Sequence, residues 1–170
     1  MSTKDIIDFH GDLEEGQEGE RVFAQYLIKN KYYSISYNND SAWDVCATSP
    51  KTRLNTFFEV KTDVLCKPGK DTGNMAIEIR FKGRPSGISV TEANYFVYLF
   101  KFLERDNLHI IDSNKLRDLI RENFHRLKVV KGGDNNNSEL VLIPRKTYKD
   151  YFFTSTLNYD KTKKELKQEN

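Results

Sequence analysis

Short runs of β-branched and aromatic residues, separated by turn-forming clusters, fill the first half of the chain and most constrain its fold. Asn, Asp, Pro, Gly and Ser lie between the runs, which is the pattern of consecutive β-strands. Four strands are predicted in this way, at residues 32–37, 42–48, 54–61 and 74–81. We expect these strands to follow one another as a meander.

Helices and further strands flank this region. Residues 14–29 place apolar side chains at helical spacing behind an acidic first turn, and residues 113–127 do the same behind a cap at Ser113. A helical turn with a capping box formed by Ser89 and Glu92 is expected to lead into an aromatic strand. The later predicted strands are 107–112 and a hairpin made of 127–130 and 139–144.

This order of elements predicts an α/β domain with a central mixed β-sheet flanked by helices. A chain of 170 residues can bury one core, so a single domain is expected over residues 1–160. Residues 161–170 lack core-forming side chains and are expected to fray. No apolar run approaches the roughly 20 residues of a membrane span, and the first residues resemble no export or organelle signal. A cytoplasmic location is therefore expected.

Two charged side chains end the third predicted strand, whose sequence is TFFEVK. Side chains alternate between the faces of a strand, so Phe58 and Val60 are expected to face the core. Glu59 and Lys61 then lie side by side on the opposite face. Asp44 alternates with apolar neighbours on the preceding strand, and it converges with Glu59 if the two strands are hairpin neighbours.

Such a set of side chains suits metal-assisted hydrolysis of a phosphodiester. The carboxylates of Asp44 and Glu59 offer the oxygen ligands that Mg²⁺ prefers, and Mn²⁺ is expected to substitute. Lys61 would hold the attacking water or stabilise negative charge in the transition state. The triplet Glu-x-Lys also arises by chance, as at Glu165 and Lys167, and an acid beside a lysine can be a solvated ion pair.

Asp44, Glu59 and Lys61, preceded by a helix carrying Gly16 and Glu20, resemble the PD-(D/E)XK nuclease superfamily. The helix sequence GQEGERVFAQYL is similar to the opening helix of archaeal-type Holliday-junction resolvases, in which an acidic residue joins the metal site. The later stretch with Ser-Gly-Ile followed by Thr, Ala and aromatics resembles phage- and bacteria-borne members. The resemblance covers roughly residues 14 to 100, and it departs from the pattern in having Trp, not Pro, before the aspartate.

This resemblance implies a restriction-endonuclease-like core and a Mg²⁺-dependent endonuclease that acts on DNA, in the cytoplasm of a bacterium or a phage-infected host. Asp44 and Glu59 would be the metal ligands, and Glu20 would be a further catalytic residue. Glu20 shares a helical stripe with Phe23 and Leu27 that is expected to pack on the sheet, whereas Glu18 is expected to face solvent. A junction resolvase would be a homodimer, because two symmetric cuts need two active sites.

A basic stretch follows the predicted site and is expected to contact DNA phosphates, although it would also suit a solvated strand and turn. A serine in the sequence RPSGISVTE could add a hydroxyl near a helix start, where a tight turn explains the same letters. The candidate DNA-binding residues are Arg80, Lys82, Arg84, Ser86, Lys67 and Lys70. The alternative to an enzyme is a catalytically silent nucleic-acid-binding or assembly protein that keeps the nuclease fold.

Overall fold

The computed structural model describes residues 3–38, 42–64, 69–102, 106–157, 159–160 and 165–166. Its helices are α1 (Thr3–Lys29) and α2 (Ser113–Asn123), with the 3₁₀ turns η1 (Gly87–Ser89), η2 (Asp134–Asn136) and η3 (Lys149–Tyr151). Its strands are β1 (Tyr33–Tyr37), β2 (Val45–Thr48), β3 (Asn55–Asp63), β4 (Asn74–Phe81), β5 (Arg84–Pro85), β6 (Tyr95–Lys101), β7 (Asp106–Asp112), β8 (Lys128–Gly132), β9 (Ser138–Pro144), β10 (Phe153–Leu157), β11 (Tyr159–Asp160) and β12 (Glu165–Leu166).

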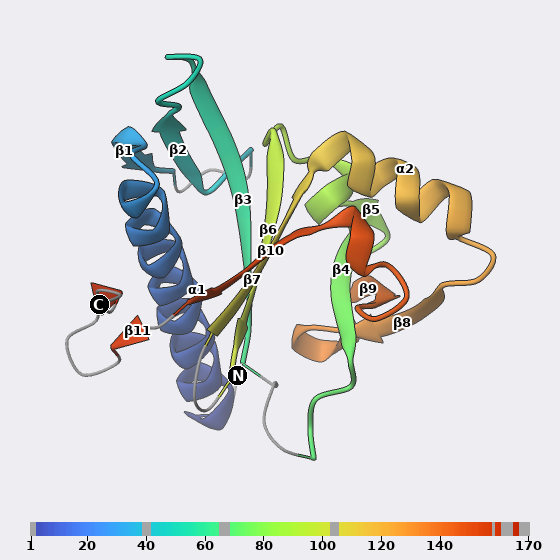
Figure 1. Ribbon diagram of the computed structural model, residues 1–170. Helices are drawn as coiled ribbons and strands as arrows, with labels where there is room; N and C mark the ends of the chain where they lie inside the picture. The colour runs from blue at the N-terminus through green and yellow to red at the C-terminus, as the bar shows by residue number, and fades with distance from the viewer. Residues whose placement is uncertain are drawn as a thin grey trace.

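The central sheet is mixed, which confirms the predicted α/β class. Its six strands have the order β1-β2-β3-β6-β7-β10, and only β3 and β6 run parallel to each other (Figure 1). The predicted meander is confirmed for β1, β2 and β3. It is wrong for β4, because β6 and not β4 occupies the free edge of β3.

β4 instead belongs to a second sheet of four strands, in the order β5-β4-β9-β8. This sheet was not expected from the sequence. Met75 and Ile77 of β4 are buried, as are Val141 and Ile143 of β9, and the two strands pair antiparallel. These apolar side chains pack against residues of the central sheet, so the two sheets face each other. The predicted hairpin between 127–130 and 139–144 forms as β8 and β9.

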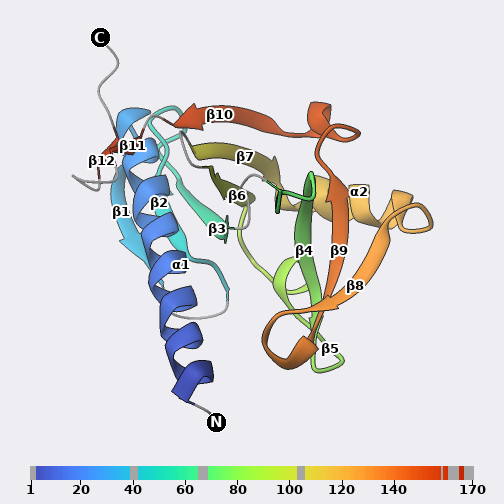
Figure 2. The same cartoon turned by 90° about the horizontal axis from the view of Figure 1, so that it is seen from below.

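The central sheet is covered on both faces, so the molecule has three layers (Figure 2). On one face α1 packs Val22, Phe23 and Leu27 against strand residues that include Phe58 and Val97. On the other face the second sheet and α2 enclose a larger apolar cluster. Strand β6 contributes alternate side chains to both cores, whereas the apolar side chains of β3 join only the core under α1. This is why β6 is buried along most of its length.

Two predicted caps are corrected. Helix α2 is capped by Asp112, whose carboxylate accepts the N–H groups of Asn114 and Lys115, whereas Ser113 is already helical and buried. Asp112 is the last residue of β7, so the cap lies one position earlier than predicted. The capping box of Ser89 and Glu92 does not form either, because the Ser89 hydroxyl donates to a backbone carbonyl of β4.

The chain end is partly described. Glu165–Leu166 pairs with Tyr159–Asp160 as a two-stranded ribbon, and β12 lies beside α1 (Figure 2). Residues 161–164 and 167–170 of the predicted tail lie outside the described residues. Within the described ranges, no helix combines the length and the apolar character needed to cross a membrane.

Candidate active site

Asp44 lies beside β3, as the sequence predicted. Its N–H donates to the carbonyl of Phe58 at 2.9 Å, and its Oδ2 accepts the N–H of Val60 at 2.7 Å. The two bonds hold the Asp44 side chain at the point where β2 begins, directly across from Glu59. The pairing of β2 with β3, with Val45 opposite Phe58, sets this position.

Glu59 and Lys61 follow the predicted alternation. Phe58 and Val60 pack in the core under α1, so the side chains of Glu59 and Lys61 belong to the opposite face of β3. Glu59 is half-buried and accepts a hydrogen bond from the Thr91 hydroxyl at 2.8 Å. Lys61 is exposed, which leaves its ammonium group accessible to a substrate.

Glu20 approaches the same place from α1. The helix comes very close to β3 one residue earlier: a Cβ on Gly19 would lie 1.9 Å from Thr62 Oγ1, so only glycine permits this packing. Gly16, which the resemblance singled out, has open space at its Cβ position: outside its own helix backbone, no described atom lies within 4 Å. Phe23 and Leu27 are buried and Glu20 is half-buried, so the predicted stripe does face the sheet.

The carboxylates of Asp44, Glu59 and Glu20 repel one another, and the positive charge near them is too small to balance this repulsion. Burial and the repulsion from Asp44 raise the pKa of Glu59 to about 7 and that of Glu20 to about 7. Burial also raises the pKa of Asp44, against the Val60 N–H and the charge of Lys61. The site therefore favours either bound protons or an added cation near neutral pH.

The donor set is compatible with Mg²⁺. It consists of carboxylate oxygens that repel one another, and a hard divalent cation would remove this repulsion. Asp44 and Glu59 would hold the ion, with Glu20 beside them. In the conformation seen, no group of three or more His, Cys, Asp and Glu side chains in the described part of the chain is close enough together to form a ligand cage.

One expectation for α1 is wrong. Glu18 does not simply face solvent, because its Oε2 is 2.9 Å from Nζ of Lys101 on β6, a side chain that is only 13% exposed. Glu18 does lie on a different side of α1 from Glu20, but the long side chain of Lys101 extends from the sheet to meet it. The side chain of Glu15 lies outside the described residues.

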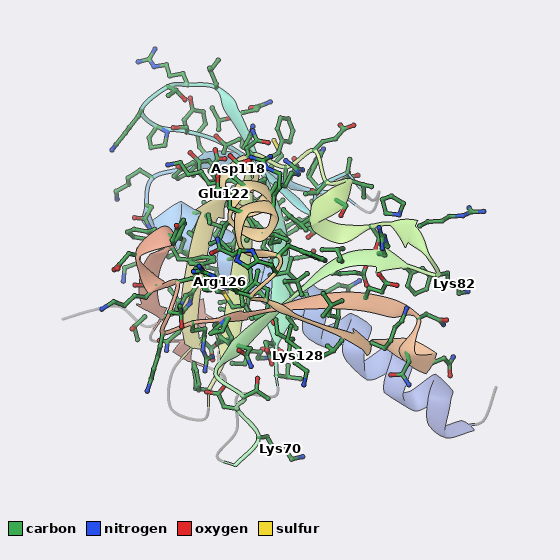
Figure 3. All side chains as sticks on the ribbon, turned by 90° about the vertical axis from the view of Figure 1, so that its right-hand side faces the viewer. Lys70, Lys82, Asp118, Glu122, Arg126 and Lys128 are labelled. Atoms are coloured by element: carbon green, nitrogen blue, oxygen red, sulfur yellow. The ribbon has the colours of Figure 1, made fainter. Side chains whose placement is uncertain are left out.

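Those predicted DNA-binding residues that the structure describes do not form one patch. Lys70 and Lys82 lie at separate ends of the molecule (Figure 3). Arg80 contacts the carboxylate of Glu139 at 3.3 Å, and Lys82 stacks on the neighbouring Phe81 ring. Arg84 is exposed.

The remaining two candidates are Ser86 and Lys67. The Ser86 hydroxyl is buried, with no hydrogen-bond partner among the described residues. Lys67 lies outside the described residues.

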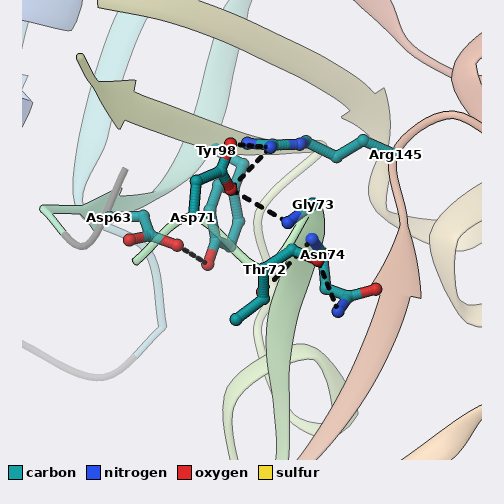
Figure 4. Close-up of polar contacts among 7 residues, drawn as sticks. All are labelled: Asp63, Asp71, Thr72, Gly73, Asn74, Tyr98 and Arg145. Atoms are coloured by element: carbon teal, nitrogen blue, oxygen red, sulfur yellow. Dashed lines mark hydrogen bonds and ion pairs between the residues drawn. The ribbon is translucent and has the colours of Figure 1, made fainter. Parts of the chain in front are cut away.

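A second polar network anchors β3 two residues beyond Lys61 (Figure 4). Asp63 Oδ2 accepts a hydrogen bond from the Tyr98 hydroxyl at 3.1 Å, and the same hydroxyl accepts the N–H of Ala76 at 3.2 Å. Arg145 pairs with Asp71, and its N–H donates to the carbonyl of Gly73, in the turn directly before β4. Tyr98 lies opposite Lys61 in the register, so this network fixes the strand that presents the lysine.

Sequence reasoning missed Thr91 and Tyr37. Thr91 lies in the stretch interpreted as a helical turn, and its contact with Glu59 joins positions 32 residues apart. Tyr37 is the last residue of β1. Burial, and then the nearby Glu20 carboxylate, raise the pKa of Tyr37. No local pattern signals either contact, because both depend on the packing of distant segments.

Comparisons of the chain with family models, with curated proteins and with solved structures found no match. The functional interpretation therefore depends on the geometry of the residues themselves.

Proposed function

We propose that this protein is a Mg²⁺-dependent nuclease that hydrolyses phosphodiester bonds of DNA. The observation that carries the proposal is the meeting of Asp44 and Glu59 at the start of β2 and on β3, with Lys61 exposed beside them. Glu20 supports it, since this fourth charged group reaches the site from a different element and couples to Asp44.

Membership of the PD-(D/E)XK superfamily, with a restriction-endonuclease-like core, is part of this proposal. Three features agree with the resemblance. An opening helix carries an acidic residue that interacts with Asp44, and Asp44 directly precedes β2, which pairs antiparallel with the strand that carries Glu59 and Lys61. The sheet is mixed and has a helix on each side, together with the second sheet on one of them. Such features are compatible with the family and are not unique to it.

Each residue has a distinct part in the proposed reaction. Asp44, held by the Val60 N–H, and Glu59, held by the Thr91 hydroxyl, would bind Mg²⁺. The ion would supply charge neutralisation and a more acidic water. Lys61 would orient that water or hydroxide toward the phosphorus, and its positive charge would stabilise the charge that builds on the phosphate oxygens.

A cleavage assay tests the proposal. Supercoiled, linear, single-stranded and four-way-junction DNA would each be incubated with Mg²⁺, with Mn²⁺ and with excess chelator. We expect cutting with either metal and none with chelator, and Asp44→Asn should abolish it. Lys128→Ala, an exposed lysine on β8 of the second sheet, is the control for purification and should cut normally.

The same assay separates the two functional classes. Tight DNA binding without cleavage of any substrate in either metal would contradict the enzyme and favour a silent nucleic-acid-binding protein. Cleavage of the four-way junction alone, by a dimer, would favour a resolvase.

A further inference from the structure

The segment from Ser86 to Thr91 connects the second sheet to the candidate site. Thr91 at its end is 4% exposed, and its Oγ1 is 2.8 Å from Glu59 Oε2 and 3.0 Å from the carbonyl oxygen of Ala42. That carbonyl already accepts the N–H of Glu92 at 2.9 Å. Thr91 has a single hydroxyl proton, and an ionised Glu59 carboxylate is a stronger acceptor for it than the Ala42 carbonyl.

Helix α2 holds the Thr91 backbone in place. Arg117 Nη2 donates to the Thr91 carbonyl at 2.5 Å, and Nε of the same guanidinium donates to the carbonyl of Ile88 at 2.9 Å. Leu116 and Leu119 are buried and anchor the helix in the core. The rigid fork of the guanidinium thus fixes two carbonyls of one segment at once.

β4 holds the segment from the other side. Gly87 has a φ of +53°, and a Cβ there would lie 2.5 Å from the carbonyl oxygen of Glu78, so this approach requires glycine. The Ser89 hydroxyl donates to Ile79 O at 2.9 Å, and the Thr91 N–H donates to Gly87 O at 3.0 Å. The segment that carries the Thr91 hydroxyl is consequently bound to both α2 and β4, so the hydroxyl has little freedom to move with Glu59.

We infer that Thr91 is a positioning residue that orients Glu59 to bind the metal ion, and that Arg117 acts through Thr91 from α2. This inference rests on the proposed function. A carboxylate on a strand can rotate about its side-chain bonds, and a fixed donor on Oε2 selects one orientation and leaves Oε1 for the ion. Groups that hold metal ligands in this way typically change metal affinity by about 10- to 100-fold when they are removed.

The test measures Mn²⁺ affinity by calorimetry and the Mg²⁺ dependence of DNA cleavage in matched variants. Thr91→Val keeps the shape and removes the hydroxyl, so Mn²⁺ should bind at least about tenfold more weakly. Thr91→Ser keeps the hydroxyl and should stay within about threefold of the wild type. A purely structural role would not separate these two variants in metal affinity once both have been shown to fold.

Arg117→Lys tests the second step with Thr91 left intact, and we expect Mn²⁺ binding about three- to tenfold weaker because a lysine cannot reach both carbonyls. Arg121→Lys is its control, since Arg121 is exposed on the same helix and contacts only Asp118 in the described structure. If Thr91→Val fails to fold, the Arg117→Lys result decides alone.

The outcomes distinguish this inference from the proposed function. If Thr91→Val or Arg117→Lys binds Mn²⁺ as tightly as the wild type does, the inference is overturned. The proposed function still stands in that case, provided that the wild type binds metal and cuts DNA. A wild type that binds Mn²⁺ but cuts no DNA overturns the proposed nuclease activity. The Mn²⁺ affinities of the variants still decide the role of Thr91. Absence of Mn²⁺ binding to the wild type overturns both.

Discussion

Replacing a candidate metal ligand should make the metal-free protein more stable, and Glu59→Gln is the sharpest case. Burial and the neighbouring Asp44 raise the pKa of Glu59 from its ordinary value of 4.5 to about 7. The folded state thus holds this proton more tightly than the unfolded state does. Below pH 4.5 Glu59 is protonated in both states, and its ionisation then disfavours the folded state progressively as the pH rises to 7 and above.

The size of the effect follows from the pKa. Each tenfold change in proton affinity corresponds to about 1.4 kcal/mol, so ionised Glu59 lowers the free energy of unfolding by at most about 3 kcal/mol at pH 8. Solvent screening reduces this figure, and we expect Glu59→Gln to gain about 1 to 3 kcal/mol at pH 8 in chelator. For a domain of this size, each kcal/mol raises the melting temperature by roughly 2 to 4 °C.

Thermal and urea unfolding at pH 5 and pH 8, with chelator and with Mg²⁺, measure this gain. It should be large at pH 8 and small at pH 5, and Mg²⁺ should stabilise the wild type but not the variant. Glu139→Gln is the matched control, because Lys131 and then Arg80 lower the pKa of Glu139, so its neutralisation should bring no gain at pH 8. A Glu59→Gln variant that is less stable than the wild type at pH 8, or equally changed at both pH values, refutes the electrostatic reasoning.

Three further predictions concern the helix, the lysine and the metal. Gly19→Ala should lower the free energy of unfolding by about 1 to 3 kcal/mol and reduce cleavage, because its methyl group meets Thr62. Gly16→Ala has open space and should raise the free energy of unfolding by about 0.5 to 1 kcal/mol, and chemical denaturation compares the two variants. Lys61→Ala should abolish cleavage with the melting temperature almost unchanged, since the side chain is exposed; near-normal turnover would reduce Lys61 to an ion-pair partner. Ca²⁺ in place of Mg²⁺ should support DNA binding with little or no cutting, which a gel-shift assay beside a cleavage assay would reveal.

Local patterns predicted those parts of the fold in which neighbours in sequence are neighbours in space. The residues of β4 were predicted with their observed bounds because alternating apolar side chains mark both ends of the strand. Asp44 and Glu59 could be brought together because a short connection joins β2 to β3. Helix α2 ends at Asn123, earlier than predicted, and Leu127 is buried after the helix has ended.

Long-range pairing was beyond the reach of these patterns. The alternation in β4 indicates which face of the strand is apolar, but it does not identify β9 as the pairing strand. The second sheet was therefore missed. The contact of Thr91 with Glu59 and the ion pair of Glu18 with Lys101 depend on the same tertiary arrangement. In each case the residue type was visible in the sequence, and its partner was fixed only by the packing of the layers.

The chain passes back and forth between the two sheets: β1 to β3 lie in the central sheet, β4 and β5 in the second, β6 and β7 in the central, β8 and β9 in the second, and β10 in the central again. Neither sheet can therefore be completed until most of the chain has been synthesised. A nascent chain that has emerged only through β7 carries Asp44, Glu59 and Lys61, yet β4 still lacks β9, its main pairing partner. Because contacts so distant in sequence form slowly, we expect folding to be slow and cooperative, with the site assembled late.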